Sequence, residues 1–140
     1  MRRRDERRQA FLLLFENSFH GYGLAEIIKI KKVFKDSNIC EFAKVIFFGV
    51  NKHKDEIEKM ICENSTFWKK DRLSRVALCL LKIAIFEMLY NNLPESIAIN
   101  EAVDLAKEYG TDGDWSFVNG VLSTVGKMLK RDNANASCKG

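Results

Sequence analysis

The stretch INEAVDLAKEYGTDGDWSFVNGVL, residues 99–122, decides the fold. It predicts two helices joined by a tight, acidic turn that contains glycine. Asn100 is placed to act as the N-cap of the first helix, because an asparagine side chain accepts a hydrogen bond from the first turn. Gly110 stands where helices commonly end on a left-handed residue, and Asp112 or Asp114 can cap the second helix. The second helix has apolar residues spaced three and four apart, the pattern of one buried face. These residues are Val118, Val121, Leu122, Val125, Met128 and Leu129.

Four more helices are expected ahead of this stretch, because apolar residues recur there at helical spacing. Their expected ranges are 3–20, 24–34, 40–62 and 71–91. The helix over 71–91 is apolar over so much of its circumference that we expect other helices to surround it. No segment alternates polar and apolar residues as a strand does. The fold class is therefore all-α, with short connections between neighbouring helices.

Length and charge limit the class of protein. At 140 residues, the chain is expected to form one domain over 1–131 with a flexible polar tail over 132–140. The formal net charge is +4, and the excess lies in residues 1–71, which carry 15 basic and 11 acidic residues. A concentrated basic end is a candidate nucleic-acid footprint. The apolar run over 10–15 is too short for a signal peptide or a membrane span.

The cysteine pattern fits a reducing cytoplasm. None of the four cysteines forms a C-x-x-C pair, so we expect no disulfide framework. Three of them stand in apolar helical stretches, where a free cysteine packs as a small hydrophobic residue. These three are Cys40, Cys62 and Cys79.

The sequence carries no pattern typical of an enzyme. Its two histidines, His20 and His53, are expected at a helix end and on a partly exposed helix face. Glu101 and Asp104 stand three residues apart, but the charged residues beside them favour a solvated helix face. No nucleophile motif, phosphate-binding loop or metal-ligand spacing occurs. We therefore expect no catalysis, no metal and no cofactor.

The N-terminal run MRRRDERR is the best candidate for binding a partner. On a helix, Arg4, Arg7 and Arg8 share one face, and guanidinium groups suit phosphate oxygens. A solvated helix start with local arginine–carboxylate pairs explains the run equally well.

Two aromatic residues flank the acidic turn. Tyr109 precedes the turn and Phe117 follows it, close enough to share one surface. Either ring can stack on a base of single-stranded nucleic acid or belong to the core, and the spacing leaves both open. Asn119 and Gly120 are unusual inside a helix, where glycine costs about 1 kcal/mol relative to alanine, and they suggest close approach by another group.

The opening stretch resembles the C-terminal signature of the bacterial NusB family of transcription antitermination factors, in INEAVDLAKEYG and FVNGVL. The resemblance continues in the block LKIAIFEML at 81–89 and in the spacing from Phe42 to Gly49. In the first helix it rests on Arg4, Arg7, Ala10, Leu14 and Phe15. It covers about 3–129 and implies a NusB-like fold. In that fold two small helical bundles, about 1–70 and 71–131, pack into one domain.

The resemblance also implies a function. Family members bind boxA, a short single-stranded element of nascent ribosomal RNA, together with the ribosomal protein NusE. With RNA polymerase and other Nus factors they suppress premature termination in ribosomal RNA operons. Carried over to this chain, the RNA contacts are Arg3, Arg4, Arg7, Tyr109, Phe117 and Asn119. NusE is expected on an apolar patch near the connection at 91–97.

Three residues depart from the family pattern: Asp5 inside the arginine run, Gly113 in the acidic turn and Phe15 in place of a tyrosine. Two other functions compete with RNA binding. One is an accessory helical domain like that of certain ribosomal RNA methyltransferases, which the chain length disfavours because little follows Leu129. The other is a helical protein that binds only protein, with its arginines in solvent.

Overall fold

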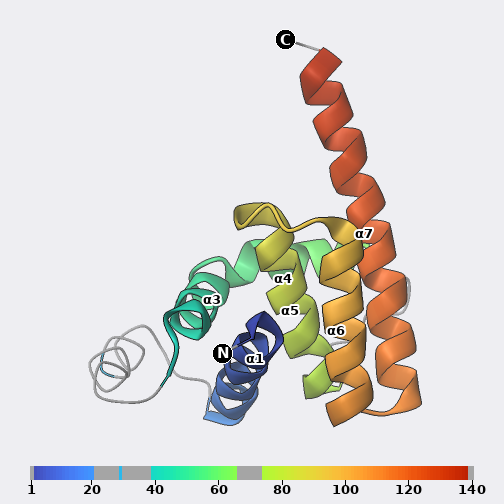
Figure 1. Ribbon diagram of the computed structural model, residues 1–140. Helices are drawn as coiled ribbons and strands as arrows, with labels where there is room; N and C mark the ends of the chain where they lie inside the picture. Colours follow the sequence, from blue (N-terminus) through green and yellow to red (C-terminus); the bar gives the residue numbers. More distant parts are fainter. Residues whose placement is uncertain (1, 21–28, 30–38, 66–73, 139–140) are drawn as a thin grey trace.

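The structure is a computed structural model that describes residues 2–20, 29, 39–65 and 74–138 (Figure 1). Across these residues the regular elements are helices, which confirms the all-α class. They are α1 Arg3–His20, α3 Glu41–Lys52, α4 Lys54–Glu63, α5 Arg75–Tyr90, α6 Glu95–Tyr109 and α7 Asp112–Cys138. The helix predicted over 24–34 lies almost wholly outside the described residues.

α5 is the central helix, as its apolar circumference predicts. It contacts each of the other described helices, and most of its length is buried. Ser74 caps it, because its side-chain oxygen accepts a hydrogen bond from the N–H of Ala77 at 3.0 Å. A single hydrophobic core therefore runs through both halves of the chain and includes residues from all six helices.

The other helices surround α5. α6 and α7 pack against α5 and against each other, while α1, α3 and α4 pack against the rest of its circumference and α4 also contacts α7 (Figure 1). The buried residues Val118, Val121, Leu122 and Val125 confirm the predicted inner face of α7. The far end of α7 projects beyond the other helices, and the helix continues to Cys138, into the segment predicted as a flexible tail.

The helix predicted over 40–62 is two helices. The break falls at His53, which has φ −105° and ψ 22°, although its N–H still bonds to the carbonyl of Gly49 at 3.0 Å. The His53 ring stacks on the Tyr90 ring with centroids 4.2 Å apart, and Nδ1 lies 3.1 Å from the Tyr90 hydroxyl. This contact with the end of α5 coincides with the break.

The predicted start of the helix in the opening stretch is wrong. α6 begins at Glu95, directly after Pro94, so Asn100 lies inside the helix and is not its N-cap. Proline fits such a start because its fixed φ suits a helix entry and it has no N–H to leave unpaired. Asn92 takes φ 53° between α5 and α6, a left-handed conformation that asparagine tolerates.

The turn after α6 also differs from prediction. Gly110 is extended, with φ −117° and ψ −163°, and is not left-handed. Thr111 caps α7: its hydroxyl accepts the N–H of Asp114 at 3.3 Å, and the Asp114 carboxylate accepts the N–H of Thr111 at 2.9 Å. A Cβ at Gly110 would lie 2.5 Å from that carboxylate, so this turn requires glycine for space.

Two remaining observations concern cysteines and membranes. Cys79 is buried and Cys40 half-buried, as predicted for apolar helical positions, but Cys62 is exposed. Within the described residues, no helix is both long enough and apolar enough to span a bilayer.

Candidate nucleic-acid interface

Arg7 is buried in a pair with Glu87 of α5. Its Nε donates to both carboxylate oxygens, at 3.1 and 2.8 Å, and the two side chains are 7% and 3% exposed. Glu101 of α6 lies 3.9 Å from the same guanidinium. Burial raises the pKa of the Glu87 carboxyl, and the hydrogen bond from Arg7 opposes that rise. Arg7, which the resemblance marks as an RNA contact, is therefore a buried residue that joins α1 to the central helix.

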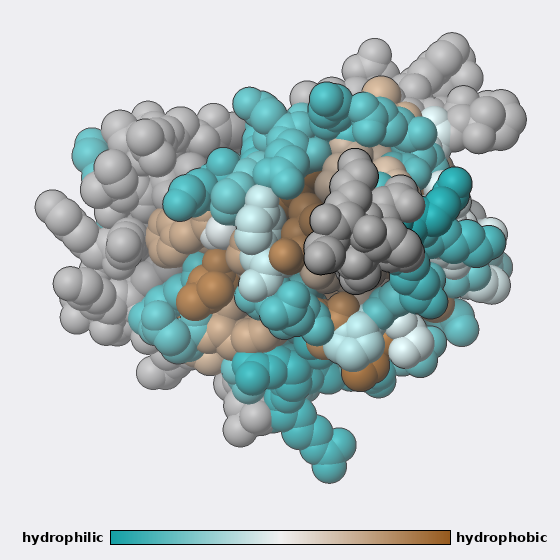
Figure 2. Space-filling model, turned by 90° about the horizontal axis from the view of Figure 1, so that it is seen from above, coloured by the Kyte–Doolittle hydropathy of each residue, from teal (hydrophilic) through white to brown (hydrophobic). Residues whose placement is uncertain are grey.

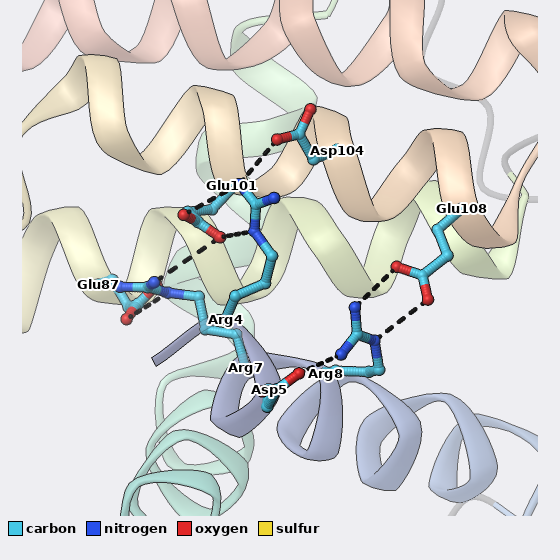
Figure 3. Close-up of polar contacts among 8 residues, drawn as sticks. All are labelled: Arg4, Asp5, Arg7, Arg8, Glu87, Glu101, Asp104 and Glu108. Atoms are coloured by element: carbon cyan, nitrogen blue, oxygen red, sulfur yellow. Dashed lines mark hydrogen bonds and ion pairs between the residues drawn. The ribbon is translucent and has the colours of Figure 1, made fainter. Parts of the chain in front are cut away.

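Arg4 and Arg8 also pair across helices, as Figure 3 shows. Arg4 donates to Glu101 at 3.0 Å and to Asp104 at 2.8 Å. Arg8 donates to the two oxygens of Glu108 at 3.2 and 3.0 Å, and also to Asp5. The hydrogen bonds with Glu101 and Glu108 are the main reason that the pKa values of Arg4 and Arg8 are raised.

The predicted solvated face of α6 is therefore an ion-paired face. Glu101 and Asp104 hold the first turns of α1 against α6, and Glu108 does the same one turn later. Local pairs exist as well, from Arg3 to Glu6 at 3.1 Å and from Arg8 to Asp5.

The arginine cluster is not an uncompensated basic patch. Four arginines of α1, Arg3, Arg4, Arg7 and Arg8, have six carboxylates as ion-pair partners. The carboxylates are Asp5, Glu6, Glu87, Glu101, Asp104 and Glu108. Arg3 remains the most open, with a side chain 56% exposed, and its guanidinium carbon lies 4.1 Å from the centroid of the Phe42 ring.

Tyr109 stands beside α1. Its ring centroid is 5.0 Å from that of the buried Phe11, and the residue is 37% exposed. Phe11 stacks in turn on Phe15 at 5.7 Å. Together with the pair between Arg8 and Glu108, this contact sets the arginines of α1 next to the end of α6 and the aromatic turn. One side of the Tyr109 ring packs on the core while part of the side chain stays open.

The other residues singled out by the sequence lie on α7. Phe117 is half-buried and packs against the core, while Asn119 and Gly120 are exposed. A Cβ at Gly120 would meet nothing within 4 Å, so the close approach expected there does not come from this chain. Close approach occurs elsewhere, at Gly49 against the Phe86 ring and at Gly126 against the Glu95 side chain.

The departures at Phe15 and Gly113 have simple local settings. Phe15 packs against the rings of Phe11 and Phe19, so a phenylalanine makes apolar contacts at this position. A Cβ at Gly113 would come no closer than 3.7 Å to the Thr111 hydroxyl, so the turn has room for a side chain there.

Sequence reasoning missed the acidic partners Glu87 and Glu108. A signal existed for Glu87: it is a carboxylate inside the most apolar of the described helices, where an unpaired charge is too costly. No comparable signal marks Glu108, which lies 100 residues from Arg8 in sequence.

Among the described residues, no cluster of three or more histidine, cysteine, aspartate or glutamate side chains could hold a metal ion.

The first helix carries arginines that are ion-paired to two helices of the bundle, beside an exposed tyrosine. These features define a class: an all-α protein with a candidate nucleic-acid face. The family model described as NusB family matches residues 4–127. The chain belongs to the NusB family.

Several proteins are similar to this chain over nearly their full length. The transcription antitermination protein NusB of Clostridium novyi is 40% identical over 135 residues, 93% of this chain and 99% of the relative. Among solved structures, NusB of T. maritima is similar with a TM-score of 0.74, 29% identity and coverage of 91% and 92% of the two chains. A crystal structure of the antitermination factors NusB and NusE in complex with dsRNA is similar with a TM-score of 0.73, 28% identity and coverage of 90% and 96%.

Proposed function

We propose that this protein is a transcription antitermination factor that binds boxA-type leader RNA together with NusE. With RNA polymerase and other Nus factors, it supports processive transcription of ribosomal RNA operons in the cytoplasm. Membership of the NusB family supports this function, as does the similar structure in which NusB and NusE are held with RNA. The observation that carries it is the contact of α1 with the end of α6, which sets arginines beside an exposed aromatic ring.

The arginines divide by role. Arg3 and Arg4 have exposed guanidinium groups and meet RNA phosphates, since a guanidinium fork matches phosphate oxygens. Arg7 is too deeply buried to reach RNA without leaving Glu87, so it acts as a positioning residue that holds α1 in place. This division modifies the carried-over role of Arg7.

The aromatic residues and Asn119 supply the base contacts. The open side of Tyr109 stacks on a base, while Phe117 offers only its exposed edge. Asn119 is exposed on α7 and hydrogen-bonds to a base or a sugar. Gly120, with open space at its Cβ position, lets a ligand approach the α7 backbone closely.

NusE docks at the end of the molecule that carries the connection between α5 and α6. Figure 2 looks onto this end and shows areas of hydrophobic surface among hydrophilic ones. Two large hydrophobic residues that flank the connection are exposed, Tyr90 at 42% and Ile97 at 44%. An exposed apolar patch with a polar rim is typical of a protein-binding surface.

Residues 1–131 act as one domain, from which α7 continues to Cys138. The protein acts by binding and is not an enzyme, a role supported by its similarity to transcription antitermination proteins.

RNA titrations at several salt concentrations test the proposal. Arg3→Ala/Arg4→Ala should weaken binding and reduce the slope of log K against log salt by about 0.7 for each lost phosphate contact to a single strand. The matched control is Lys54→Ala/Lys59→Ala, which also removes two positive charges, both from exposed residues of α4. Single-stranded boxA should bind more tightly than the same sequence in a duplex, because stacking needs a splayed base. An unchanged slope in the double variant would remove α1 from the footprint.

A further inference from the structure

The guanidinium groups that the RNA site needs are already occupied. Arg8 presents Nε and Nη2 to the two oxygens of Glu108, at 3.2 and 3.0 Å. Arg4 presents Nε and Nη2 to Glu101 and adds Asp104 at 2.8 Å (Figure 3). A phosphate offers the same pair of acceptor oxygens to the same edge of a guanidinium. Two carboxylates of α6, Glu108 at Arg8 and Asp104 at Nη2 of Arg4, therefore stand where RNA phosphates would bind.

We propose that Asp104 and Glu108 compete with RNA phosphates for Arg4 and Arg8, and that this competition sets the selectivity of the site. The inference rests on the proposed function, because it requires RNA on α1. An RNA that also stacks on Tyr109 gains enough to displace the carboxylates. An RNA that offers only phosphates does not, so the carboxylates act against non-specific binding.

Exposure decides which carboxylates can be displaced. Asp104 and Glu108 are each 45% exposed, so on release they return to water at little cost. Glu87 is buried and would be left as an uncompensated charge, so its pair with Arg7 stays closed. Glu101 is largely covered and lies near both Arg4 and Arg7, so it remains with the buried pair.

Position gives the competition its link to base recognition. Glu108 immediately precedes Tyr109, whose ring rests on Phe11 of α1. A base on the open side of Tyr109 would therefore carry its own phosphate toward Arg8 and Glu108. Arg8, which the family resemblance does not mark, becomes an RNA contact that is available only when Glu108 leaves.

The test neutralises the competing carboxylates without changing their shape. The variants are Glu108→Gln and Asp104→Asn, singly and together. The matched control is Glu63→Gln on α4, which changes net charge as much as each single variant and removes an exposed carboxylate whose ion-pair partner among the described residues is Lys59. Dissociation constants are measured with NusE present, for labelled boxA-type RNA and for a scrambled single strand of equal length and composition.

Each single variant should bind the scrambled RNA more tightly than the Glu63→Gln control by roughly fivefold, the factor that one unit charge about 4 Å away produces in water, and the double variant should add the two gains. The gain for boxA should be smaller, so the selectivity ratio should fall. When Arg8 is replaced by alanine, Glu108→Gln should increase RNA affinity no more than Glu63→Gln does. Thermal melting of each variant confirms that the fold is kept.

Each outcome bears on one claim. If wild type binds boxA and the variants match the control on both RNAs, the competition is overturned and the proposed function stands. If the variants tighten boxA and scrambled RNA by the same factor, the carboxylates do not set selectivity. If neither wild type nor any variant binds either RNA, the proposed function fails and the competition fails with it.

Discussion

The buried pair between Arg7 and Glu87 offers a sharp test of how α1 is held in place. Arg7→Met keeps a long side chain but removes the guanidinium, leaving Glu87 buried and without its partner. Breaking a buried pair in this way costs about 3–5 kcal/mol. For a domain of this size, 1 kcal/mol lowers the melting temperature by roughly 2–4 °C, so a fall of about 6–20 °C is expected.

The pH dependence of this variant has a definite sign. Burial already raises the pKa of Glu87 above its unfolded value, and loss of Arg7 raises it further. A carboxyl with a raised pKa in the folded state favours folding at low pH and loses that contribution as the pH rises through the folded-state pKa. The deficit of Arg7→Met against wild type should therefore shrink as the pH is lowered from neutral toward the raised pKa.

Melting followed by circular dichroism, with urea titrations, measures these effects. Arg3→Met is the matched control, because it removes an exposed pair with Glu6 and should cost no more than about 1 kcal/mol. Arg7→Met/Glu87→Leu should recover most of the loss, since apolar side chains can replace a buried pair at little cost. The reasoning is refuted if Arg7→Met melts like Arg3→Met, or if the double variant is no more stable than Arg7→Met.

Two further predictions separate packing from binding. Tyr109→Ala should weaken boxA binding by about 1–3 kcal/mol with a small loss of folding stability. Phe117→Ala should also lose folding stability, but less than the about 3–5 kcal/mol expected for a fully buried phenylalanine, because Phe117 is half-buried. RNA affinity and melting temperature, measured on the same samples, separate the two roles. Gly49→Ala should destabilise by about 1–3 kcal/mol, because its Cβ would lie 2.2 Å from the Phe86 ring. Gly120→Ala should stabilise the folded protein by about 0.5–1 kcal/mol, because its Cβ would lie in open space within α7. Equal changes in the free energy of unfolding for Gly49→Ala and Gly120→Ala, measured by urea titration, would contradict the packing described here.

The sequence predicts the helices best where their apolar pattern is continuous. α5 and the inner face of α7 follow from spacing alone, because burial of a helix depends on residues three and four apart. The sequence misplaces the start of α6 at Asn100 because asparagine favours N-caps, whereas the helix begins directly after Pro94, a residue that also suits a helix start. The break at His53 has no local breaker residue and coincides with a contact to Tyr90, which lies 37 residues away in sequence.

The candidate site could be predicted only in part. Arg7 stands three, four and seven residues before Ala10, Phe11 and Leu14, all buried, so its place on the inner stripe of α1 could have been read from the sequence. The partners of Arg4 and Arg8 could not, because Asp104 and Glu108 lie 100 residues away and pair through the packing of α1 on α6. The family resemblance anticipated which elements meet, but not that the arginines are already paired.

A titration of labelled boxA RNA tests the central claim most directly. The RNA is titrated with this protein, with NusE and with an equimolar mixture, and the mixture is repeated with Arg3→Ala/Arg4→Ala. The mixture should bind more tightly than either protein alone, RNA should tighten the protein–protein complex by the same factor, and the double variant should lose affinity in the mixture. Equal affinity for the mixture and for the better single protein, or no effect of the double variant, would contradict the account.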